Sequence, residues 1–252
     1  MMERPLSRQA LIVLPIMGAT LILAAWQFLV PLAGIPAYIV PTPTTIAGVF
    51  ANQWPLLISN LWPTLFESIA GFLIGNSVAV LLAIVFAYSR VMQAAYFPVI
   101  LFFNTIPILA LAPIIILIFG LGMLPKIIIA AVICFFPTLV NMIRGLNSAT
   151  RNEQELLRIL SATPWEIFWQ LRFPRSLPML FSSLRIASTT CVIGAIVGEW
   201  IGSDKGLGAL IIQATFNYRA GQLYAAIVLS SSMAILLFAI VAYIEKKVID
   251  YT

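Results

Sequence analysis

The chain has 252 residues, of which 62% are hydrophobic and only 9% are charged. About a quarter of the residues of a soluble domain are charged, so this composition excludes a surface that faces only water and places much of the chain in lipid. A transmembrane helix takes roughly 20 residues, so the length allows about six spans and no large domain outside the membrane.

Two residue types narrow the possible chemistry. The chain contains no histidine, which excludes histidine-based proton relays and zinc sites, and we expect neither a metal site nor a catalytic residue. Cys134 and Cys191 stand far apart inside apolar runs, where we expect them to act as small core side chains. The excess of 14 basic over 9 acidic residues favours basic cytoplasmic loops rather than nucleic-acid binding.

Six long apolar segments predict six transmembrane helices, because none of them alternates as a barrel strand does. The predicted spans are residues 10–33, 63–87, 96–119, 126–143, 179–201 and 223–244. The sequence therefore predicts an all-α, polytopic membrane protein with a single domain over residues 1–252.

The basic residues orient these spans. With the N-terminus inside, most of them fall in cytoplasmic loops, which is the bias that membrane proteins show. The inner residues are Arg4, Arg8, Arg90, Arg144, Arg151, Arg158, Arg172, Arg175, Lys246 and Lys247, and the outer ones are Lys126, Lys205 and Arg219. We expect both termini to be cytoplasmic.

Two connections between the spans are long and lie outside on this orientation. Residues 34–62 contain four prolines and predict a short surface helix at 44–58. Residues 202–222 contain Gly206-Leu207-Gly208 and are compatible with a segment that enters the membrane partway.

Residues 145–178 form the long hydrophilic stretch of the sequence, and they predict a cytoplasmic hairpin of two short helices. Asn152 followed by Glu155 is a capping-box pattern for a first helix that ends at Leu160. Thr163-Pro164-Trp165-Glu166 is a stronger start signal for a second helix, which we expect Pro174 to end. Leu156, Leu157 and Leu160 form one apolar stripe, and Trp165, Phe168 and Trp169 form another. Such a hairpin either rests at the lipid headgroups or docks into a partner.

The spacing of this hairpin resembles the EAA loop of ATP-binding-cassette importer permeases. Glu155-Leu156-Leu157, Ser161 and Leu171-Arg172-Phe173-Pro174 stand where that loop has Glu-Ala-Ala, Gly and Ile-x-Leu-Pro. Leucines replace both alanines here, and Ser161 replaces the glycine.

Other fragments resemble the permease branch for sulfonates, taurine, nitrate and thiamine precursors. They include Val40-Pro41-Thr42-Pro43, Phe119-Gly120-Leu121-Gly122, Leu184-Arg185-Ile186-Ala187 and Gly206-Leu207-Gly208. The resemblance implies a permease of the bacterial inner membrane that pairs with a second copy of itself. It also implies a cytoplasmic ATPase dimer, which binds the ATP and magnesium, and an external solute-binding protein.

The chain has no Gly-x-x-x-x-Gly-Lys phosphate cradle, so we expect it to hold no cofactor and to hydrolyse no ATP. The resemblance implies that the partner ATPase moves the hairpin as a lever. The residues that would couple the two are Glu155, Leu156, Leu157, Arg158, Leu160, Ser161, Ala162 and Pro174.

Ionisable residues within the spans are costly and are therefore candidates for function. Glu67 and Glu199 fall in the outer third of the membrane. There they either line an outward-facing mouth, or extend to water or pair with Lys205 or Arg219. An acidic mouth would favour a neutral heterocycle or a cation, such as a thiamine or pyrimidine precursor or a flavin, over an anionic sulfonate.

Asn104 and Thr105 stand just before Pro107, where a kink frees backbone groups. We therefore add them to the substrate-pathway candidates.

Several other functions fit parts of the sequence. An importer for alkanesulfonates, taurine or nitrate would share the same architecture. An ion-coupled secondary transporter needs a coupling-ion site, usually with repeated halves, and a channel needs a filter or a ring of like charges. An intramembrane enzyme without histidine would have to use a serine–lysine pair or a carboxylate pair, for which Glu67 and Glu199 are the acids within the predicted spans. These last three leave the spacing of the hairpin unexplained.

Overall fold

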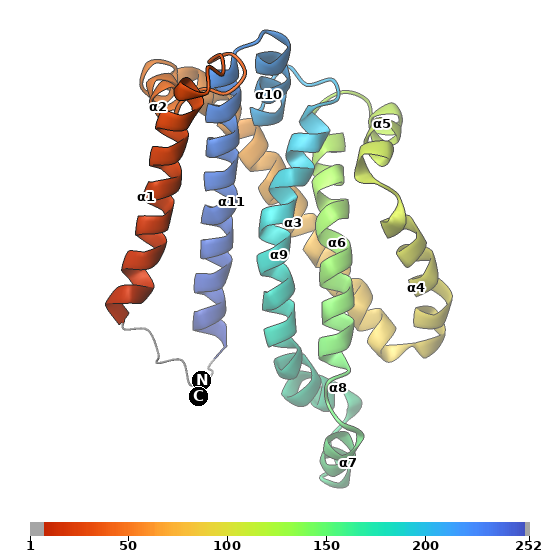
Figure 1. Ribbon diagram of the computed structural model, residues 1–252. Coiled ribbons are helices and arrows are strands. Elements are labelled where there is room, and N and C mark those ends of the chain that lie inside the picture. The colour runs from red at the N-terminus through yellow and green to blue at the C-terminus, as the bar shows by residue number, and fades with distance from the viewer. Residues whose placement is uncertain (1–7, 250–252) are drawn as a thin grey trace. The chain divides into compact units, whose positions relative to one another are not determined.

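The computed structural model describes residues 8–249, and within them the chain is helical with no strand (Figure 1). Between residues 8 and 249, five helices are long and apolar enough to cross a membrane, or six if a sharply bent pair counts as one span. The all-α membrane fold is thereby confirmed. Arg4, one of the residues that orient the spans, lies outside the described residues.

The chain divides into two compact units, and each is described here by itself. The first comprises Met1–Ile58 and Leu210–Val228, and the second comprises Ser59–Ala209 and Leu229–Thr252. The expectation of a single domain stays a prediction.

Two side-chain amides tie the first unit together. Its described elements are α1 (Arg8–Leu32), α2 (Pro43–Asn52), the start of α3 (Trp54–Tyr88), most of α10 (Leu207–Phe216) and the start of α11 (Ala220–Val248). The Gln27 amide donates to Thr44 Oγ1 and accepts from the Thr44 N–H, both at 3.1 Å, which fixes α1 against the start of α2. The Gln222 amide donates to Gln53 Oε1 at 2.5 Å and fixes α11 against the end of α2.

The proline-rich connection begins a helix by ordinary capping rules. Thr42 is the N-cap of α2, and its hydroxyl accepts from the Thr45 N–H, with Pro43 at the first helical position. The surface helix predicted at 44–58 is interrupted, because Gln53 leaves the helical region at φ −125°. The residues that follow it belong to α3, so the long second span begins earlier than the sequence indicated.

The second unit holds the remaining helices. They are the rest of α3, α4 (Arg90–Thr105), α5 (Ile108–Phe119), α6 (Met123–Leu146), α7 (Arg151–Ile159), α8 (Pro164–Ile167), the π-helical turn η1 (Phe168–Arg172), α9 (Phe173–Glu199), the start of α10 and the rest of α11. Small residues let the long helices approach closely. A Cβ added at Gly194 of α9 would lie 2.6 Å from the Ala130 Cα of α6, and one at Gly75 of α3 would lie 2.4 Å from the Ala131 carbonyl oxygen. Figure 1 shows α6 and α9 side by side.

Both cysteines belong to this tightly packed region. Cys134 and Cys191 are free and fully buried. The Cys134 thiol donates to the Ala187 carbonyl at 3.4 Å. Their expected role as small core side chains is confirmed.

The third predicted span, 96–119, is not one straight helix. It consists of α4 and α5, which meet at an angle of 102°. Pro107 explains the break, because a residue before proline avoids the helical region, and Ile106 accordingly has a ψ of 125°.

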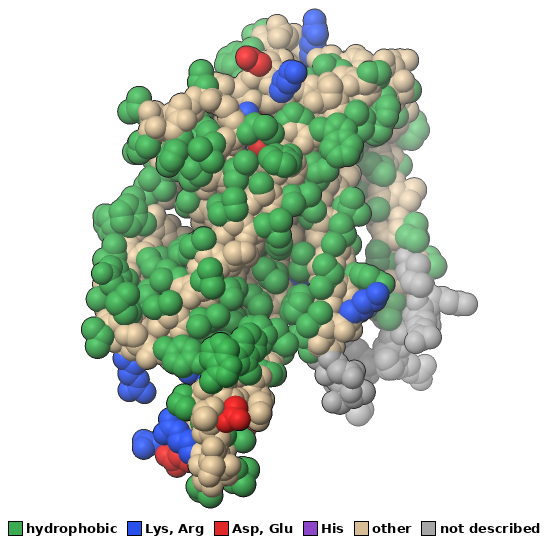
Figure 2. All heavy atoms as spheres, turned by 180° about the vertical axis from the view of Figure 1, so that it is seen from behind, with side chains coloured by type: hydrophobic (Ala, Val, Ile, Leu, Met, Phe, Trp, Pro, Cys, Tyr) green, Lys and Arg blue, Asp and Glu red, His purple; other side chains and the backbone are tan. Residues whose placement is uncertain are grey.

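Hydrophobic side chains cover most of the face shown in Figure 2, as lipid contact requires, and basic and acidic side chains lie at its upper end and at its lower end, where α7 lies. Within the second unit Arg144 stands in the last turn of α6, and Lys126 stands near the first turn of the same helix. The two residues therefore lie at opposite ends of the span, as the orientation from the sequence requires.

Candidate functional site

We define the hairpin as residues 150–172. A reciprocal capping box starts its first helix, α7. The Thr150 hydroxyl accepts from the Glu153 N–H, and the Glu153 carboxylate accepts from the Thr150 N–H at 2.8 Å. The predicted box of Asn152 and Glu155 is therefore wrong by two residues. Glu155 instead pairs with Arg151 at 2.8 Å, one turn away on the exposed side of α7.

A tight turn at Ser161 joins the two helices. Ser161 has a φ of 64°, in the left-handed region that glycine adopts most readily. Its N–H donates to the Arg158 carbonyl at 2.9 Å, and the Ala162 N–H donates to the Leu157 carbonyl at 3.0 Å. These two bonds form a Schellman motif, so serine makes the turn for which the EAA loop uses glycine.

Replacing Ser161 with glycine is expected to stabilise the turn by about 1 kcal/mol, because the left-handed conformation costs an L-residue roughly that much. Hydrogen exchange at the Ala162 amide measures the effect, with about fivefold slower exchange expected. Ser161→Ala is the matched control, since alanine meets the same steric penalty. Equal exchange rates in the two variants would contradict the assignment of strain to this position.

The second helix of the hairpin starts as predicted. The Thr163 hydroxyl accepts from the Glu166 N–H, the Glu166 carboxylate accepts from the Thr163 N–H at 2.7 Å, and Pro164 occupies the first position. Pro174 does not end this helix. The chain continues from α8 through η1 into α9, where Pro174 lies in the first turn, a position that tolerates proline. The hairpin is therefore continuous with a membrane helix.

The exposed face of the hairpin is apolar. Leu156, Ile159 and Leu160 of α7 are 58%, 79% and 69% exposed, whereas Leu157 is half-buried. Trp165 and Trp169 are also exposed. The exposed apolar face thus also includes Ile159, which the predicted stripe omits, although Ile159 lies three residues after Leu156 and the helical period alone would have found it.

The hairpin is held firmly at its base by Phe168. This residue is buried, and its ring centroid lies 5.6 Å from that of Tyr88 on α3 and 5.9 Å from that of Phe173 on α9. It belongs to a buried cluster that includes Phe86 of α3 and Leu146 of α6. The predicted aromatic stripe therefore has one anchoring member and two exposed members.

Two arginines that the sequence analysis did not single out as coupling residues strengthen this base. Arg172 Nε donates to the Leu146 carbonyl at 3.0 Å, and its terminal nitrogens donate to the Ala87 carbonyl at 3.4 Å. These carbonyls lie at the ends of α6 and α3, where a positive charge is favoured. Because the acceptors are backbone atoms distant in sequence, no local pattern could have identified them.

Arg175 connects α9 to the capping box of α7. It makes a two-pronged ion pair with Glu153, in which Nη1 donates to Oε2 at 2.8 Å. The hydrogen bonds from Thr150, assisted by Arg175, hold the pKa of Glu153 below its usual value. The carboxylate therefore stays ionised and keeps both contacts at neutral pH.

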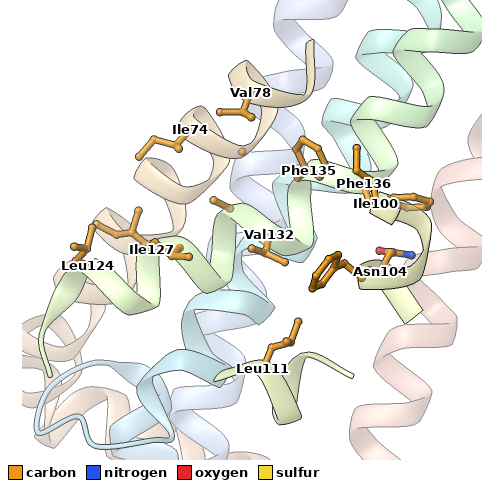
Figure 3. A pocket seen from close by; sticks show the side chains of 14 residues that line it. Ile74, Val78, Ile100, Asn104, Leu111, Leu124, Ile127, Val132, Phe135 and Phe136 are labelled. Carbon is orange, nitrogen blue, oxygen red and sulfur yellow. The ribbon is translucent and has the colours of Figure 1, made fainter. Parts of the chain in front are cut away.

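A largely apolar cavity of about 560 Å³ lies among α3, α4, α5 and α6 (Figure 3). Its walls include the rings of Phe103, Phe135 and Phe136, and the side-chain amide of Asn104 is the polar group among the described residues that line it. Asn104 thus lies at a cavity, and its place in the substrate pathway stays a prediction. Thr105 is not among the lining residues, and its hydroxyl donates to the Phe102 carbonyl at 2.7 Å within α4.

Glu67 and Glu199 lie in a separate, buried polar network, 0% and 1% exposed. Lys126 Nζ lies 3.2 Å from Glu67 Oε1 and donates to Ser203 Oγ at 2.7 Å. The ion-pair partner of Glu67 is therefore Lys126, and not Lys205 or Arg219 as the alternative interpretation had it.

Glu199 caps the start of α10. Its carboxylate accepts from the Thr64 hydroxyl and from the Gly208 N–H, both at 2.6 Å, and the Thr64 oxygen in turn accepts from the Leu207 N–H at 2.8 Å. A Cβ at Gly208 would lie 2.9 Å from the carboxylate oxygen Oε2. A negative charge at a helix N-terminus is electrostatically favoured.

The geometry thus gives Glu67 and Glu199 a structural role in this conformation, with neither side chain open to a mouth. Their place in the substrate pathway stays a prediction. A buried carboxylate needs donors or a counter-ion. Glu199 has donors in Thr64 and Gly208, whereas Glu67 has Lys126 as its counter-ion but accepts no hydrogen bond among the described residues.

Comparison with known proteins now identifies the family. The family model described as "Binding-protein-dependent transport system inner membrane component" matches residues 75–250. The riboflavin transport system permease protein RibX of Chloroflexus aurantiacus is 33% identical over 236 residues, which cover 92% of this chain and 87% of the relative. A probable ABC transporter permease of Haemophilus influenzae is 31% identical over 89% of this chain and 91% of its own length.

Two further comparisons agree. The formylaminopyrimidine transport permease protein ThiX of Halalkalibacterium halodurans is 30% identical over 94% of this chain and 95% of its own length. A solved inward-facing structure of the MetNI methionine ABC transporter has the same fold, with a TM-score of 0.61 at 23% identity over 79% of this chain and 98% of that one. The chain therefore belongs to the family of inner-membrane components of binding-protein-dependent transport systems, and it is a permease subunit of an ABC importer.

Proposed function

We propose that this permease subunit imports a small, neutral heterocyclic solute, and that a separate ATPase drives it through the hairpin. The observation that carries the coupling half is the exposure of Leu156, Ile159 and Leu160 on a hairpin that is otherwise well anchored. Large exposed apolar side chains in water are unfavourable, and a contiguous patch of them is typical of a protein contact site. Glu155 and Arg158 would supply charge at the rim of that contact.

The anchoring supports transmission of force from the hairpin to the membrane helices. The hairpin continues into α9 through η1, so a push on α7 and α8 acts on a spanning helix without a flexible joint. Arg172 binds the ends of α3 and α6 to the same point. Movement of the hairpin would therefore shift three helices that surround or adjoin the cavity of Figure 3.

The cavity supports the choice of solute. Three phenylalanine rings and one amide suit a flat, uncharged molecule that forms a few hydrogen bonds. A sulfonate would leave its negative charge without a partner there, since no lysine or arginine is among the described residues that line the cavity. Relatives are named for riboflavin and for formylaminopyrimidine transport, and a more distant one, from Bacillus subtilis, for aliphatic sulfonates.

The remaining parts of the proposal concern the assembly. A second copy of the chain, a cytoplasmic ATPase dimer and an external solute-binding protein would complete the importer, in a bacterial inner membrane with both termini inside. The excess of arginines at the hairpin end of the second unit, Arg144, Arg158 and Arg172, over Lys126 at the other end of α6 supports this orientation.

Reconstitution tests the proposal. Vesicles that contain the chain, its ATPase and its binding protein are expected to accumulate riboflavin or formylaminopyrimidine only with ATP, and to ignore ethanesulfonate. Accumulation against a gradient without the ATPase would instead identify a secondary transporter, and preference for ethanesulfonate would refute the choice of solute.

A matched pair of variants tests the cavity. Asn104→Leu removes the one amide side chain among the described residues that line the cavity and is expected to lower uptake about tenfold, since one lost hydrogen bond to a bound solute is worth roughly that factor. Thr105→Val is the control, because its hydroxyl serves its own helix. Equal uptake by the two variants would remove Asn104 from the pathway.

A further inference from the structure

A second cavity, of about 650 Å³, lies at the base of the hairpin, and its lining is strongly basic. The guanidinium groups of Arg90, Arg151, Arg158 and Arg172 line it, with Glu155 as the one carboxylate among its described lining residues. Four positive charges against one negative charge leave a net charge of three. The importer mechanism proposed above places Glu155 and Arg158 at the rim of a protein contact and uses Arg172 as an anchor, but it gives no role to Arg90 or to the net charge of the cavity.

Only part of the positive charge is compensated within the fold. Arg172 donates to backbone carbonyls and to Asn147 Oδ1 at 3.2 Å, and Arg151 pairs with Glu155. Among the described residues no hydrogen bond or ion pair engages the guanidinium of Arg90 or that of Arg158. Two arginines from different elements, α4 and α7, therefore line one polar cavity with their donors unused.

The surroundings of Arg90 indicate where an anion would come from. Arg90 is the first residue of α4, and the residues after it expose large apolar side chains: Val91 is 79% exposed, and Tyr96, further along the helix, is 53% exposed. Apolar side chains of this kind on a spanning helix are suited to lipid chains. The cavity thus lies where α4 leaves the membrane, at the level of the lipid headgroups.

We propose that this cavity binds the phosphate of an anionic phospholipid from the leaflet on the hairpin's side, and that Arg90 and Arg158 are its principal ligands. Planar guanidinium groups match phosphate oxygens in geometry and charge. Basic pockets between helices at this depth bind anionic headgroups in other membrane proteins. The bound lipid joins α4 to α7, so it fixes the hairpin to the membrane independently of Phe168 and Arg172.

The site itself does not depend on the proposed solute or on the ATPase. Only its consequence, a dependence of coupling on anionic lipid, rests on the proposed function. The binding test below therefore uses the chain alone, so that failure of the lipid site and failure of the importer mechanism remain distinguishable.

Native mass spectrometry of the purified chain tests the site, with mixed micelles of phosphatidylglycerol and phosphatidylcholine as probes. The chain is expected to retain phosphatidylglycerol in preference to phosphatidylcholine. Arg90→Gln combined with Arg158→Gln is expected to lower this retention about 20-fold, because each basic residue near an anionic headgroup contributes roughly a factor of five. Neither arginine is buried, so the variant should fold.

Arg144→Gln is the matched control. Arg144 is exposed in the last turn of α6 but is not among the residues that line the cavity. Its replacement should therefore leave lipid retention unchanged. An equal loss in this control would reduce the effect to general charge attraction and overturn the site. Unchanged retention in the double variant would also overturn it.

Two further arms identify the source of the anion. If excess inorganic phosphate displaces the lipid, the cavity binds free phosphate and the assignment to lipid is wrong. Arg90 lies outside the hairpin. If Arg90→Gln prevents co-purification of the ATPase while lipid retention stays the same, the arginines bind a protein and the lipid proposal fails.

Discussion

Replacing Ile159 with glutamate is expected to lower co-purification of the chain with its ATPase by more than about 100-fold, and to abolish ATP-driven uptake. Ile159 is 79% exposed in the apolar face of α7, so a charge there leaves the free protein undisturbed. In the docked state the same carboxylate would be buried among apolar groups without a partner, which costs several kcal/mol. A few well-packed residues near the centre of an interface carry most of its binding energy.

Asn152→Glu is the control for this prediction. It places the same charge on the same helix, at an exposed position in the first turn, where a negative charge is favoured. Membrane insertion and yield should match the natural chain in both variants. Retention of the ATPase by Ile159→Glu would show that the exposed face of α7 is not where the partner binds.

Some features of the hairpin could be predicted from local sequence patterns, and others could not. The hairpin itself, its second capping box and its apolar character follow from spacing alone. The first capping box did not, because Thr150–Glu153 and Asn152–Glu155 both have the required spacing. The choice is reinforced by Arg175, which binds Glu153 from α9, and a contact between residues so far apart leaves no local signal.

Pro174 shows a second kind of limit. Proline can follow the end of a helix or stand in its first turn, and the sequence around Pro174 fits either case. The π-helical turn η1 lets the chain pass from α8 into α9. Aromatic packing around Phe168, which involves α3 and α9, accompanies that turn. Tertiary structure therefore decided what the sequence left open.

In the third span and at the buried acids, too, the sequence predicts that a special feature is present but not the form that it takes. A proline inside an apolar run predicts a kink, but not the angle of 102° between α4 and α5. An acid inside an apolar run predicts a special environment, but not which one. Glu67 pairs with Lys126 on another helix, and Glu199 accepts a hydrogen bond at the N-terminus of α10, and the sequence shows neither of these partners.

Replacing Lys126 with methionine is expected to destabilise the chain by about 3–5 kcal/mol, since it leaves the fully buried Glu67 carboxylate without its counter-ion. The measurement is the midpoint of thermal unfolding in detergent, followed by size-exclusion chromatography. Ser203→Ala is the control, because it removes one hydrogen bond of Lys126 and keeps the ion pair. It should cost about 1 kcal/mol.

A double variant separates the structural role of this pair from a role in solute selection. Glu67→Gln combined with Lys126→Met removes both charges, so it should recover most of the lost stability, because well-packed neutral groups often replace a buried ion pair without loss. If the pair is structural, the relative uptake of riboflavin and ethanesulfonate stays the same in the recovered protein. A changed preference would return Glu67 to the substrate pathway, and a double variant as unstable as Lys126→Met would mean that the ion pair is not what Lys126 contributes.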